Sequence, residues 1–427
     1  MSRERLVIVD GVRTPFTKMG TSLARLNASE LGRVAVNALL TKTGIDPGTI
    51  DEVIFGCVGQ PIDSANVARV IALRAGVPRS VPAVTVSRNC ASGCEAITQA
   101  DQKLAAGCGE LFVVGGVESM SQYPLLYRPS AAAKFNRLAR AKSLGQKIGA
   151  ALGFRPGDFS PLIGLKLGLS DPVCGLNMGQ TAELIGRENG ATRELQDAFA
   201  LASHQKAAAA AARLADEICP VYLPPKYKSA VTADNGPRAK QSIEALAKLR
   251  PVFERGTGTV TAGNASQVSD GAVALLVAGE TRAAQLSLEP LGTLAGYAYA
   301  GCEPSRMGLG PVYAMNKLEQ LSGLGLNDAD IIEINEAFAA QVLAVRACAE
   351  SATFARDELK RDRPLGQVPE AKLNVNGGSI ALGHPVGATG ARLALTSLLE
   401  LRRRKAKRAL ISLCIGGGQG AAMWMER

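Results

Sequence analysis

The sequence predicts an α/β fold built from two related halves, with an additional segment inserted into the first half. Over the first 120 residues, short β-rich runs alternate with helical patterns, which is typical of α/β proteins. From about Gln122 to Leu249 prolines are frequent and this alternation stops. It returns by about Glu289 and continues to the C-terminus. In two related α/β halves, the loops that leave equivalent strand ends would converge between the halves.

The expected elements follow the same order in both halves. Strands are expected at residues 6–9, 53–55, 84–86 and 111–114, with helices between them. This alternation predicts a mainly parallel sheet. Residues 328–338 repeat the strand-and-loop pattern of residues 51–60. The glycine pairs 115–116 and 416–417 are each predicted to end a late strand, and we interpret the repeat as an internal duplication.

The composition is that of an ordinary globular protein. The 427 residues are 47% apolar and 20% charged, and no stretch reaches the ~18 uncharged apolar residues of a membrane span. The first residues lack the apolar core of a signal peptide. Nine scattered cysteines fit neither a disulfide framework nor a zinc site. A cytoplasmic location is therefore expected.

Lys and Arg number 48 against 38 Asp and Glu, which gives a formal charge of +10. The excess gathers in residues 134–147 and 402–408. These runs could be solvated surface, or they could attract an anionic membrane or a polyphosphate-bearing substrate. Aromatic residues are only 4%, and no nucleic-acid-binding motif is present, so the sequence argues against nucleic acid as a partner.

Cys90 is the first candidate for chemistry. It stands between the strand expected at 84–86 and a helical pattern that Gly107 closes. At a helix N-terminus the dipole and the free N–H groups favour a thiolate and lower the thiol pKa. Ser92 and Gly93 are small enough to let a substrate approach. A buried structural cysteine is the alternative.

His384 is the candidate base. It lies in a glycine-rich segment that opens a helix, and glycines let the backbone pack close to a ligand. A histidine that titrates near neutral pH is the natural base for a thiol. The second histidine, His204, lies in a polar, alanine-rich helix and is expected to be an ordinary surface residue.

Two further signals are weaker alone. Cys414 ends an expected strand and precedes three glycines, whose N–H groups could bind an oxyanion. A glycine-rich turn with a buried cysteine would look the same. Asn335 and Glu336 follow the strand of residues 328–338, and such a pair means little by itself.

Taken together, seven motifs resemble those of the thiolase family, in order and spacing, over nearly the whole chain. They are RTPF (13–16), CASG (90–93), GGVESMS (115–121), VTAGNASQVSDGA (260–272), NEAF (335–338), GGSIALGHPVGATGAR (377–392) and CIGGGQG (414–420). The resemblance implies two βαβαβαββ halves in a five-layered α/β/α/β/α arrangement. The N-terminal half would comprise residues 1–121 and 250–286, the inserted loop domain 122–249, and the C-terminal half 287–427.

The resemblance also implies roles. Cys90 would be the acylated nucleophile, and His384 would take its proton. Cys414 would move a proton on or off the α-carbon of the second acyl-CoA. Asn335 would fix a water in one oxyanion hole, and the N–H groups of Cys90 and Gly416 would form the other. Ser266 and Met178 would contact the substrate or coenzyme A. Coenzyme A is a substrate, and no metal or redox cofactor is expected.

The sequence departs from the family pattern near the substrate. Asn177, before Met178, stands where many short-chain thiolases have histidine. The apolar segment 123–175, with residues 307–314, resembles β-subunits of long-chain fatty-acid oxidation complexes, although those often carry histidine in place of Asn335. This predicts a broad-range 3-ketoacyl-CoA thiolase acting in fatty-acid β-oxidation. The alternative is an acetyl-CoA C-acetyltransferase that makes or cleaves acetoacetyl-CoA.

The remaining alternatives concern partners and class. We interpret the segment 123–175, with its basic run at 134–147, as a lid and tunnel wall over the acyl chain. The alternative interpretation is a docking site for a membrane or a partner subunit. The family is typically dimeric or tetrameric, so a homo-oligomer is expected, with a possible multienzyme partner subunit. A ketoacyl synthase would generally need a second histidine, or a histidine and asparagine pair, arranged for loss of carbon dioxide, and Cys414 with a single histidine in the motifs argues against it. A silent scaffold subunit does not fit an intact Cys90, His384 and Cys414.

Overall fold

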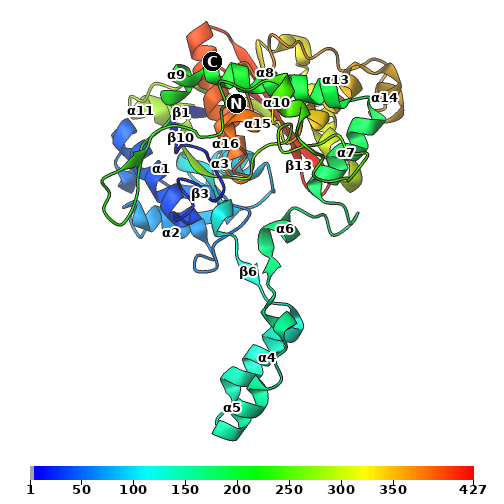
Figure 1. Ribbon diagram of the computed structural model, residues 1–427. Helices are drawn as coiled ribbons and strands as arrows, with labels where there is room; N and C mark the ends of the chain where they lie inside the picture. Colours follow the sequence, from blue (N-terminus) through cyan, green and yellow to red (C-terminus); the bar gives the residue numbers. More distant parts are fainter. Residues whose placement is uncertain (1–3) are drawn as a thin grey trace. The chain divides into compact units, whose positions relative to one another are not determined.

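The computed structural model describes residues 4–427, and its centre is one mixed sheet (Figure 1). The strand order is β12-β13-β14-β11-β1-β10-β5-β3-β4, and β2 pairs with β10. The bounds are β1 Leu6–Arg13, β2 Thr17–Lys18, β3 Glu52–Gly56, β4 Ala83–Val86, β5 Leu111–Ser119, β10 Ser269–Gly279, β11 Gly292–Gly301, β12 Ile331–Ile334, β13 Arg408–Ile415 and β14 Gln419–Glu426. The four strands expected in the first half are therefore confirmed.

Strand directions differ from the prediction. Only β3–β4, β3–β5 and β12–β13 run parallel among the described pairs of this sheet, whereas β1, β10, β11 and β14 pair antiparallel with their neighbours. The prediction of a mainly parallel sheet was wrong. Alternation of strands and helices along the chain does not reveal that β10 lies between β1 and β5, or that β14 lies between β13 and β11, and all four of these pairs are antiparallel. The two halves join through a short β1–β11 contact at Val7–Thr293 and Ile8–Gly292.

Helices form three layers about the two halves of the sheet. Between them lie α3 (Ser92–Ala105) and α16 (Thr389–Arg404), which pack on each other. Helices α1 (Ala28–Thr43) and α2 (Val67–Arg74) cover the outer face of the first half, and α12 (Gly310–Ser322) and α13 (Ala339–Glu350) that of the second. The five-layered arrangement of two duplicated halves is thus confirmed.

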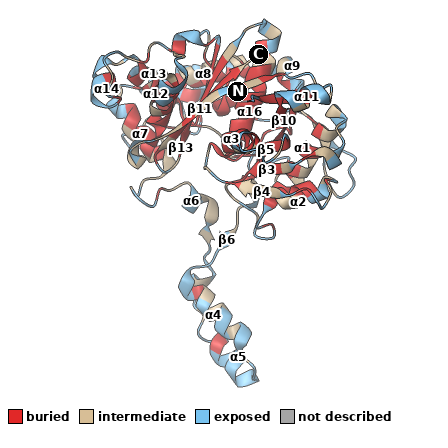
Figure 2. Ribbon diagram, turned by 180° about the vertical axis from the view of Figure 1, so that it is seen from behind, coloured by how far each residue is buried: buried red, intermediate tan, exposed pale blue. Residues whose placement is uncertain are grey.

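Three apolar clusters fill the spaces between these layers. Strand β10 shows why: Val273, Leu275 and Val277 join the central cluster with α3 and α16, while the alternating Ala274 and Leu276 join the cluster under α1 and α2. A third cluster lies between α12, α13 and the second half. A strand covered on both faces needs an unbroken apolar run, which β10 has from Ala272 to Ala278. The whole strand is buried (Figure 2).

The duplication also appears in matching polar contacts. Asp51, before β3, accepts hydrogen bonds from the N–H groups of Glu110 and Leu111 at 2.7 and 2.9 Å. Asp330, before β12, accepts from Lys407 and Arg408 at 2.8 and 2.9 Å. Equivalent carboxylates therefore tie equivalent strands in both halves.

One predicted strand end is wrong. Gly115 and Gly116 lie inside β5 and not after it, whereas Gly416 and Gly417 follow β13 as predicted. A Cβ on Gly115 would lie 2.0 Å from the carbonyl oxygen of Val273, and one on Gly116 would lie 2.0 Å from that of Gly387. The pair is needed for close packing of backbones and not for a turn.

The remaining elements complete the main compact unit, which consists of the described residues up to 122 together with 171–427. They are α7 Met178–Glu188, α8 Arg193–Ala209, α9 Ala211–Ala215, β8 Val221–Tyr222, β9 Ala230–Val231, α10 Ile243–Ala247, α11 Glu280–Gln285, α14 Ala352–Asp357 and α15 Ser379–Leu382, with the 3₁₀ turns Pro47–Thr49, Met120–Gln122, Pro304–Leu309 and Leu326–Asp328.

A second compact unit, which we call the small unit, comprises residues 123–170. Its elements are β6 Leu125–Leu126, α4 Pro129–Arg140, α5 Leu144–Ala151, the 3₁₀ turn Pro156–Phe159, β7 Leu162–Ile163 and α6 Gly164–Gly168. Phe135 packs against Tyr127 and Phe154 with ring centres 4.7 and 4.8 Å apart. The predicted domain limits at residues 121, 249 and 286 stay predictions.

No helix within residues 4–427 is long and apolar enough to cross a membrane.

Candidate active site

Cys90 lies in the turn between β4 and α3, as predicted. Asn89 adopts φ +43°, a left-handed conformation that asparagine tolerates better than most residues. The Ser92 hydroxyl accepts from the Arg88 N–H at 2.9 Å and donates to the Asn89 carbonyl at 2.8 Å. These bonds close the turn and place Cys90 just before the first turn of α3.

The electrostatics of Cys90 differ from the expectation. Burial raises the pKa of its thiol, and the N–H groups of Gly416 and of Cys90 itself oppose that rise without cancelling it. The expected net lowering of the pKa by the helix N-terminus was therefore wrong, because desolvation of the thiolate outweighs those hydrogen bonds. Cys90 rests as a thiol and needs a base.

His384 meets the requirements of that base. Burial, and then the charge of Arg392, lower the pKa of His384 to about 4, so its ring is neutral at pH 7. Its Nδ1 lies 2.7 Å from the Thr389 hydroxyl, which itself donates to the Pro385 carbonyl at 3.0 Å. Because the hydroxyl proton is used there, Thr389 accepts from Nδ1–H. The Nε2 atom of His384 is left without a proton and can accept one.

Asn335 lies beside this nitrogen. Its amide nitrogen is 3.5 Å from Nε2 of His384, and the Ser379 hydroxyl donates to its amide oxygen at 2.6 Å. Both side chains are buried. The Ser379 bond fixes the orientation of the amide, so its NH₂ group faces the histidine and its oxygen faces away.

Cys414 ends β13, and the glycine turn after it reaches Cys90. The Gly416 N–H interacts with the sulfur of Cys90, and Asn89 donates to the Gly416 carbonyl at 2.8 Å. A Cβ on Gly416 would lie 3.3 Å from the sulfur of Met178. Strand ends of both halves and the start of α7 thus converge on the nucleophile.

Cys414 itself is held as a thiol. It is fully buried, and it packs with a cluster that includes Ala337, Phe338 and Met178. Burial and then the charge of a Cys90 thiolate raise the pKa of Cys414 well above its usual value. A thiolate at Cys90 therefore disfavours ionisation of Cys414, which suits one nucleophile and one proton donor.

Ser266 and Asn177 lie near this cluster. The Ser266 N–H donates to the Ala337 carbonyl at 2.9 Å, beside the NEAF segment. The Asn177 side chain accepts from the Gln180 N–H at 3.0 Å and donates to the Gln180 side chain at 2.8 Å. Asn177 therefore caps the N-terminus of α7. In the sequence, Asn177 was compared only with the histidine of short-chain thiolases, and this capping role was not predicted.

Two further residues, His204 and Cys94, are buried. The prediction that His204 lies at the surface was wrong. It is 2% exposed, accepts from the Arg238 N–H at 3.3 Å, and burial lowers its pKa to about 4. The alanines of α8 permit close packing on α15, which covers this face. Cys94 is fully buried, and burial raises its pKa to about 12, so it is unsuited to nucleophilic attack.

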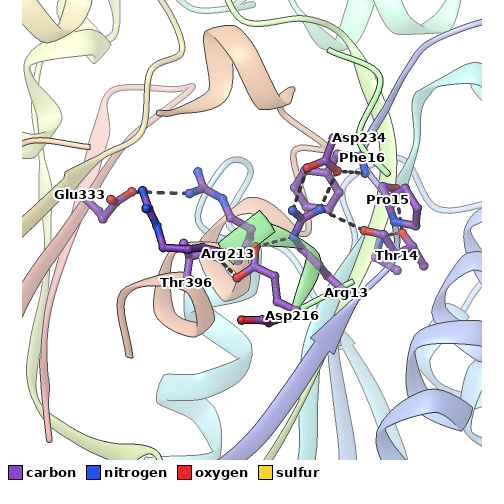
Figure 3. Close-up of polar contacts among 12 residues, drawn as sticks. Arg13, Thr14, Pro15, Phe16, Arg213, Asp216, Asp234, Glu333 and Thr396 are labelled. Atoms are coloured by element: carbon purple, nitrogen blue, oxygen red, sulfur yellow. Dashed lines mark hydrogen bonds and ion pairs between the residues drawn. The ribbon is translucent and has the colours of Figure 1, made fainter. Parts of the chain in front are cut away.

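The RTPF segment is anchored by buried polar contacts around Arg13 (Figure 3). The buried Arg13 donates to Glu217 at 2.6 Å and to both oxygens of Asp234 at 2.6 and 2.8 Å. Asp234 also accepts from the Phe16 N–H at 2.7 Å. The Phe16 ring fills the space beside Gly271. Although burial favours the neutral form, the two carboxylates keep the pKa of Arg13 above its usual value.

Sequence reasoning missed Thr389, Ser379 and Asn89. All three lie inside or next to the quoted motifs, which was the available signal. Their roles depend on partners 5, 44 and 327 positions away along the chain. Among residues 4–427 no cluster of three or more His, Cys, Asp or Glu side chains could hold a metal ion.

Comparison with known families gives two matches that together span the chain. The model described as "Thiolase, N-terminal domain" matches residues 6–281, and "Thiolase, C-terminal domain" matches residues 288–427. The chain is 41% identical to the 3-ketoacyl-CoA thiolase of Pectobacterium atrosepticum, over 99% of this chain and 97% of that protein. It is 40% identical to the 3-ketoacyl-CoA thiolase of Serratia proteamaculans over the same shares.

Solved structures agree over the same extent. The acetyl-CoA acetyltransferase of Bacillus anthracis superimposes with a TM-score of 0.86 at 36% identity, covering 99% of each chain. The human mitochondrial 3-ketoacyl-CoA thiolase in complex with CoA gives a TM-score of 0.84 at 36% identity, covering 99% of this chain and 98% of that chain.

Proposed function

The chain belongs to the thiolase family of acyltransferases, and we propose that it cleaves 3-ketoacyl-CoA with coenzyme A through an acyl group on Cys90. The products would be acetyl-CoA and a shortened acyl-CoA, and the reverse reaction would be a Claisen condensation. The observation that carries this proposal is a neutral His384, whose Nε2 carries no proton, together with two thiols in different surroundings, the partly exposed Cys90 and the buried Cys414.

The first half-reaction begins with proton transfer from the Cys90 thiol to Nε2 of His384. The Cys90 thiolate then attacks the 3-keto carbon, and the bond between C2 and C3 breaks. Cys414 donates its proton to C2 of the departing acetyl-CoA enolate. The N–H groups of Cys90 and Gly416, and a water held by Asn335, would stabilise the oxyanions that form.

The second half-reaction restores the enzyme. The Cys414 thiolate takes the proton of the incoming coenzyme A thiol, and the resulting CoA thiolate attacks the acyl-cysteine carbonyl. Cys90 leaves as a thiolate and recovers its proton from His384. Atoms and charges balance in this ping-pong cycle, and no step requires a metal or redox cofactor. Ser266 and Met178 would contact the bound CoA thioester.

We further propose a broad range of acyl chains and a role in fatty-acid β-oxidation in the cytoplasm. The names of the relatives and the apolar cluster around Cys414 and Met178 support this. The alternative, an acetyl-CoA C-acetyltransferase, is favoured by the likeness to the Bacillus anthracis enzyme. Thiolysis rates measured from C4 to C16 3-ketoacyl-CoAs separate the two. We expect kcat/KM to rise from C4 to at least C8, and a peak at acetoacetyl-CoA would support the alternative.

A homodimer or tetramer is also proposed. Strand β4 has no further strand beside it in residues 4–427, and Val84 and Thr85 on it are only partly buried. Exposed strand edges are usually covered in native proteins, so a second copy of the chain is a suitable cover. Light scattering of the purified protein tests this, and a monomer at micromolar concentration would contradict it.

A further inference from the structure

The two halves meet at backbone distance beside the site. A Cβ on Gly116 of β5 would lie 2.0 Å from the Gly387 carbonyl oxygen, and one on Gly93 of α3 would lie 2.5 Å from the Ala391 nitrogen. The segment from His384 to Ala391 therefore rests directly on the half that carries Cys90. At such distances a small shift of either backbone moves the base relative to the nucleophile.

Glu118, in the GGVESMS motif, provides a polar link at this junction. Its side chain is fully buried. One oxygen, Oε2, accepts from the Gly387 N–H at 2.9 Å and from the Val58 N–H at 3.2 Å. The other, Oε1, accepts from the Gly59 N–H at 2.8 Å. A single carboxylate thus joins the loop after His384 to the loop after β3.

On one side this link leads to His384. Gly387 belongs to the turn in which the Pro385 carbonyl accepts from the N–H groups of Ala388 and Thr389, at 2.9 and 3.0 Å. The same carbonyl accepts from the Thr389 hydroxyl, which accepts a hydrogen bond from Nδ1–H of His384. Holding Gly387 in place therefore holds the group that sets the tautomer of the base.

On the other side the link leads to Cys90. The Cys57 N–H donates to the carbonyl of Val86, the last residue of β4, at 3.1 Å. Gly56 lies so close to the first residue of α3 that a Cβ on it would be 2.5 Å from the carbonyl carbon of Ser92. The segment 56–59, which Glu118 binds through its backbone N–H groups, thus packs against both ends of the turn that carries Cys90.

We propose that Glu118 is a positioning residue that holds the base and the nucleophile of the thiolase reaction in register across the junction of the two halves. This inference rests on the proposed reaction at Cys90. Glutamine at this position would keep the shape but offer one oxygen and place an NH₂ group against a backbone N–H, so at least one of the three bonds is lost.

The test compares Glu118→Gln with Asp51→Asn. Asp51 also accepts two backbone N–H bonds from β5, but at the opposite end of that strand. We expect E118Q to lower kcat for thiolysis about tenfold or more, with KM within about threefold, because misplaced reacting groups slow chemistry more than binding. D51N should leave both constants within about twofold. Thermal unfolding of both variants controls for loss of fold.

Cys90 chemistry provides the second readout. The pH profile of Cys90 alkylation by iodoacetamide should stay in place or move to lower pH in E118Q, since a nearby negative charge is removed. Acylation of Cys90 by acetyl-CoA should nevertheless become slower. The role of Glu118 would be overturned if kcat were equal in E118Q and the wild type. It would also be overturned if the rates of Cys90 alkylation and Cys90 acylation fell by the same factor. Absence of thiolysis in the wild-type enzyme would instead overturn the proposed function.

Discussion

The main unit and the small unit differ in how far their charged side chains are paired with opposite charges. In the main unit, buried charges such as Arg13 and Glu118 are bonded on several sides, and the basic run at 402–408 pairs with Glu289, Glu400, Asp216 and Glu426. The small unit has eight Lys and Arg against one acid, Asp158, which forms an ion pair with Lys134. It holds +7 of the chain's +10 in 48 residues.

Apolar groups show the same contrast. The main unit buries three large clusters, whereas the buried residues of the small unit are Ala131 and Ala150. Leu144, Ile148 and Leu152 of the small unit are all more than half exposed. Catalysis needs reacting side chains that are fixed by contacts on all sides, and of the two units only the main unit provides such contacts. The small unit instead presents an apolar and cationic surface that suits contact with another molecule.

The largest expected effect places the reaction in the main unit. Replacing Cys90 with Ala should lower thiolysis by about 10³-fold or more, since the nucleophile is removed. Peptide mass spectrometry after incubation with acetyl-CoA should find the acyl group on Cys90 of the wild-type enzyme. Cys94→Ala is the matched control and should still be acylated. An acyl group on Cys94 or Cys414 and never on Cys90 would contradict the assignment.

The next effect separates the two thiols. Cys414→Ala should still permit acylation of Cys90 from a simple acyl-CoA, because that half-reaction moves no α-carbon proton. Thiolysis and condensation should fall by about 10²-fold, the usual contribution of general acid–base catalysis. Stopped-flow acylation and steady-state thiolysis of the same preparation measure both. Equal loss of acylation from a simple acyl-CoA in a folded C414A protein would contradict the role of Cys414 as the acid and base at the α-carbon.

Acid should weaken the main unit, which contains both histidines. His204 and His384 have pKa values of about 4 in the folded chain and would have about 6.5 when unfolded. Between these values the unfolded chain binds more protons at the two histidines, so their contribution to stability falls as pH falls from 6.5 to 4, whereas Glu333, whose pKa burial raises to about 7, opposes this loss. Each histidine contributes about 3 kcal/mol at neutral pH that is lost over this window.

Urea unfolding at pH 7.5 and at pH 5.0 measures this loss. His204→Gln keeps an acceptor for the Arg238 N–H and should remove the contribution of His204, about 2 kcal/mol between these pH values. A pH dependence unchanged in H204Q would show that other groups control it.

The smallest expected effect concerns the small unit. If residues 134–147 form a lid over the acyl chain, replacing them with a short Gly/Ser linker should reduce the preference for C8 over C4 several-fold. Each buried methylene contributes about 0.8 kcal/mol at most. Rates with C4 substrate should stay the same. If the preference for C8 persists and the variant only loses cosedimentation with anionic vesicles or a partner, the segment is a dock.

The sequence by itself determined the local geometry of the site. Cys90 after a short strand and before a helix, His384 before α16, and the glycine turn after Cys414 are all where their neighbours in sequence predict them. Such features depend on contacts between residues close along the chain, which a local pattern encodes. Strand β10 was not predicted by alternation, since both of its faces are buried, and only its first residues lie within the motif at 260–272.

Tertiary structure alone decided the electrostatics and the junction of the halves. The direction of the Cys90 pKa shift, the burial of His204, and the strand interior occupied by Gly115 and Gly116 each contradicted the sequence prediction. Glu118 and Gly387 lie 269 positions apart, yet one hydrogen bond joins them. Desolvation and long-range contacts depend on which distant segments cover a residue, and no local pattern of residues contains that information.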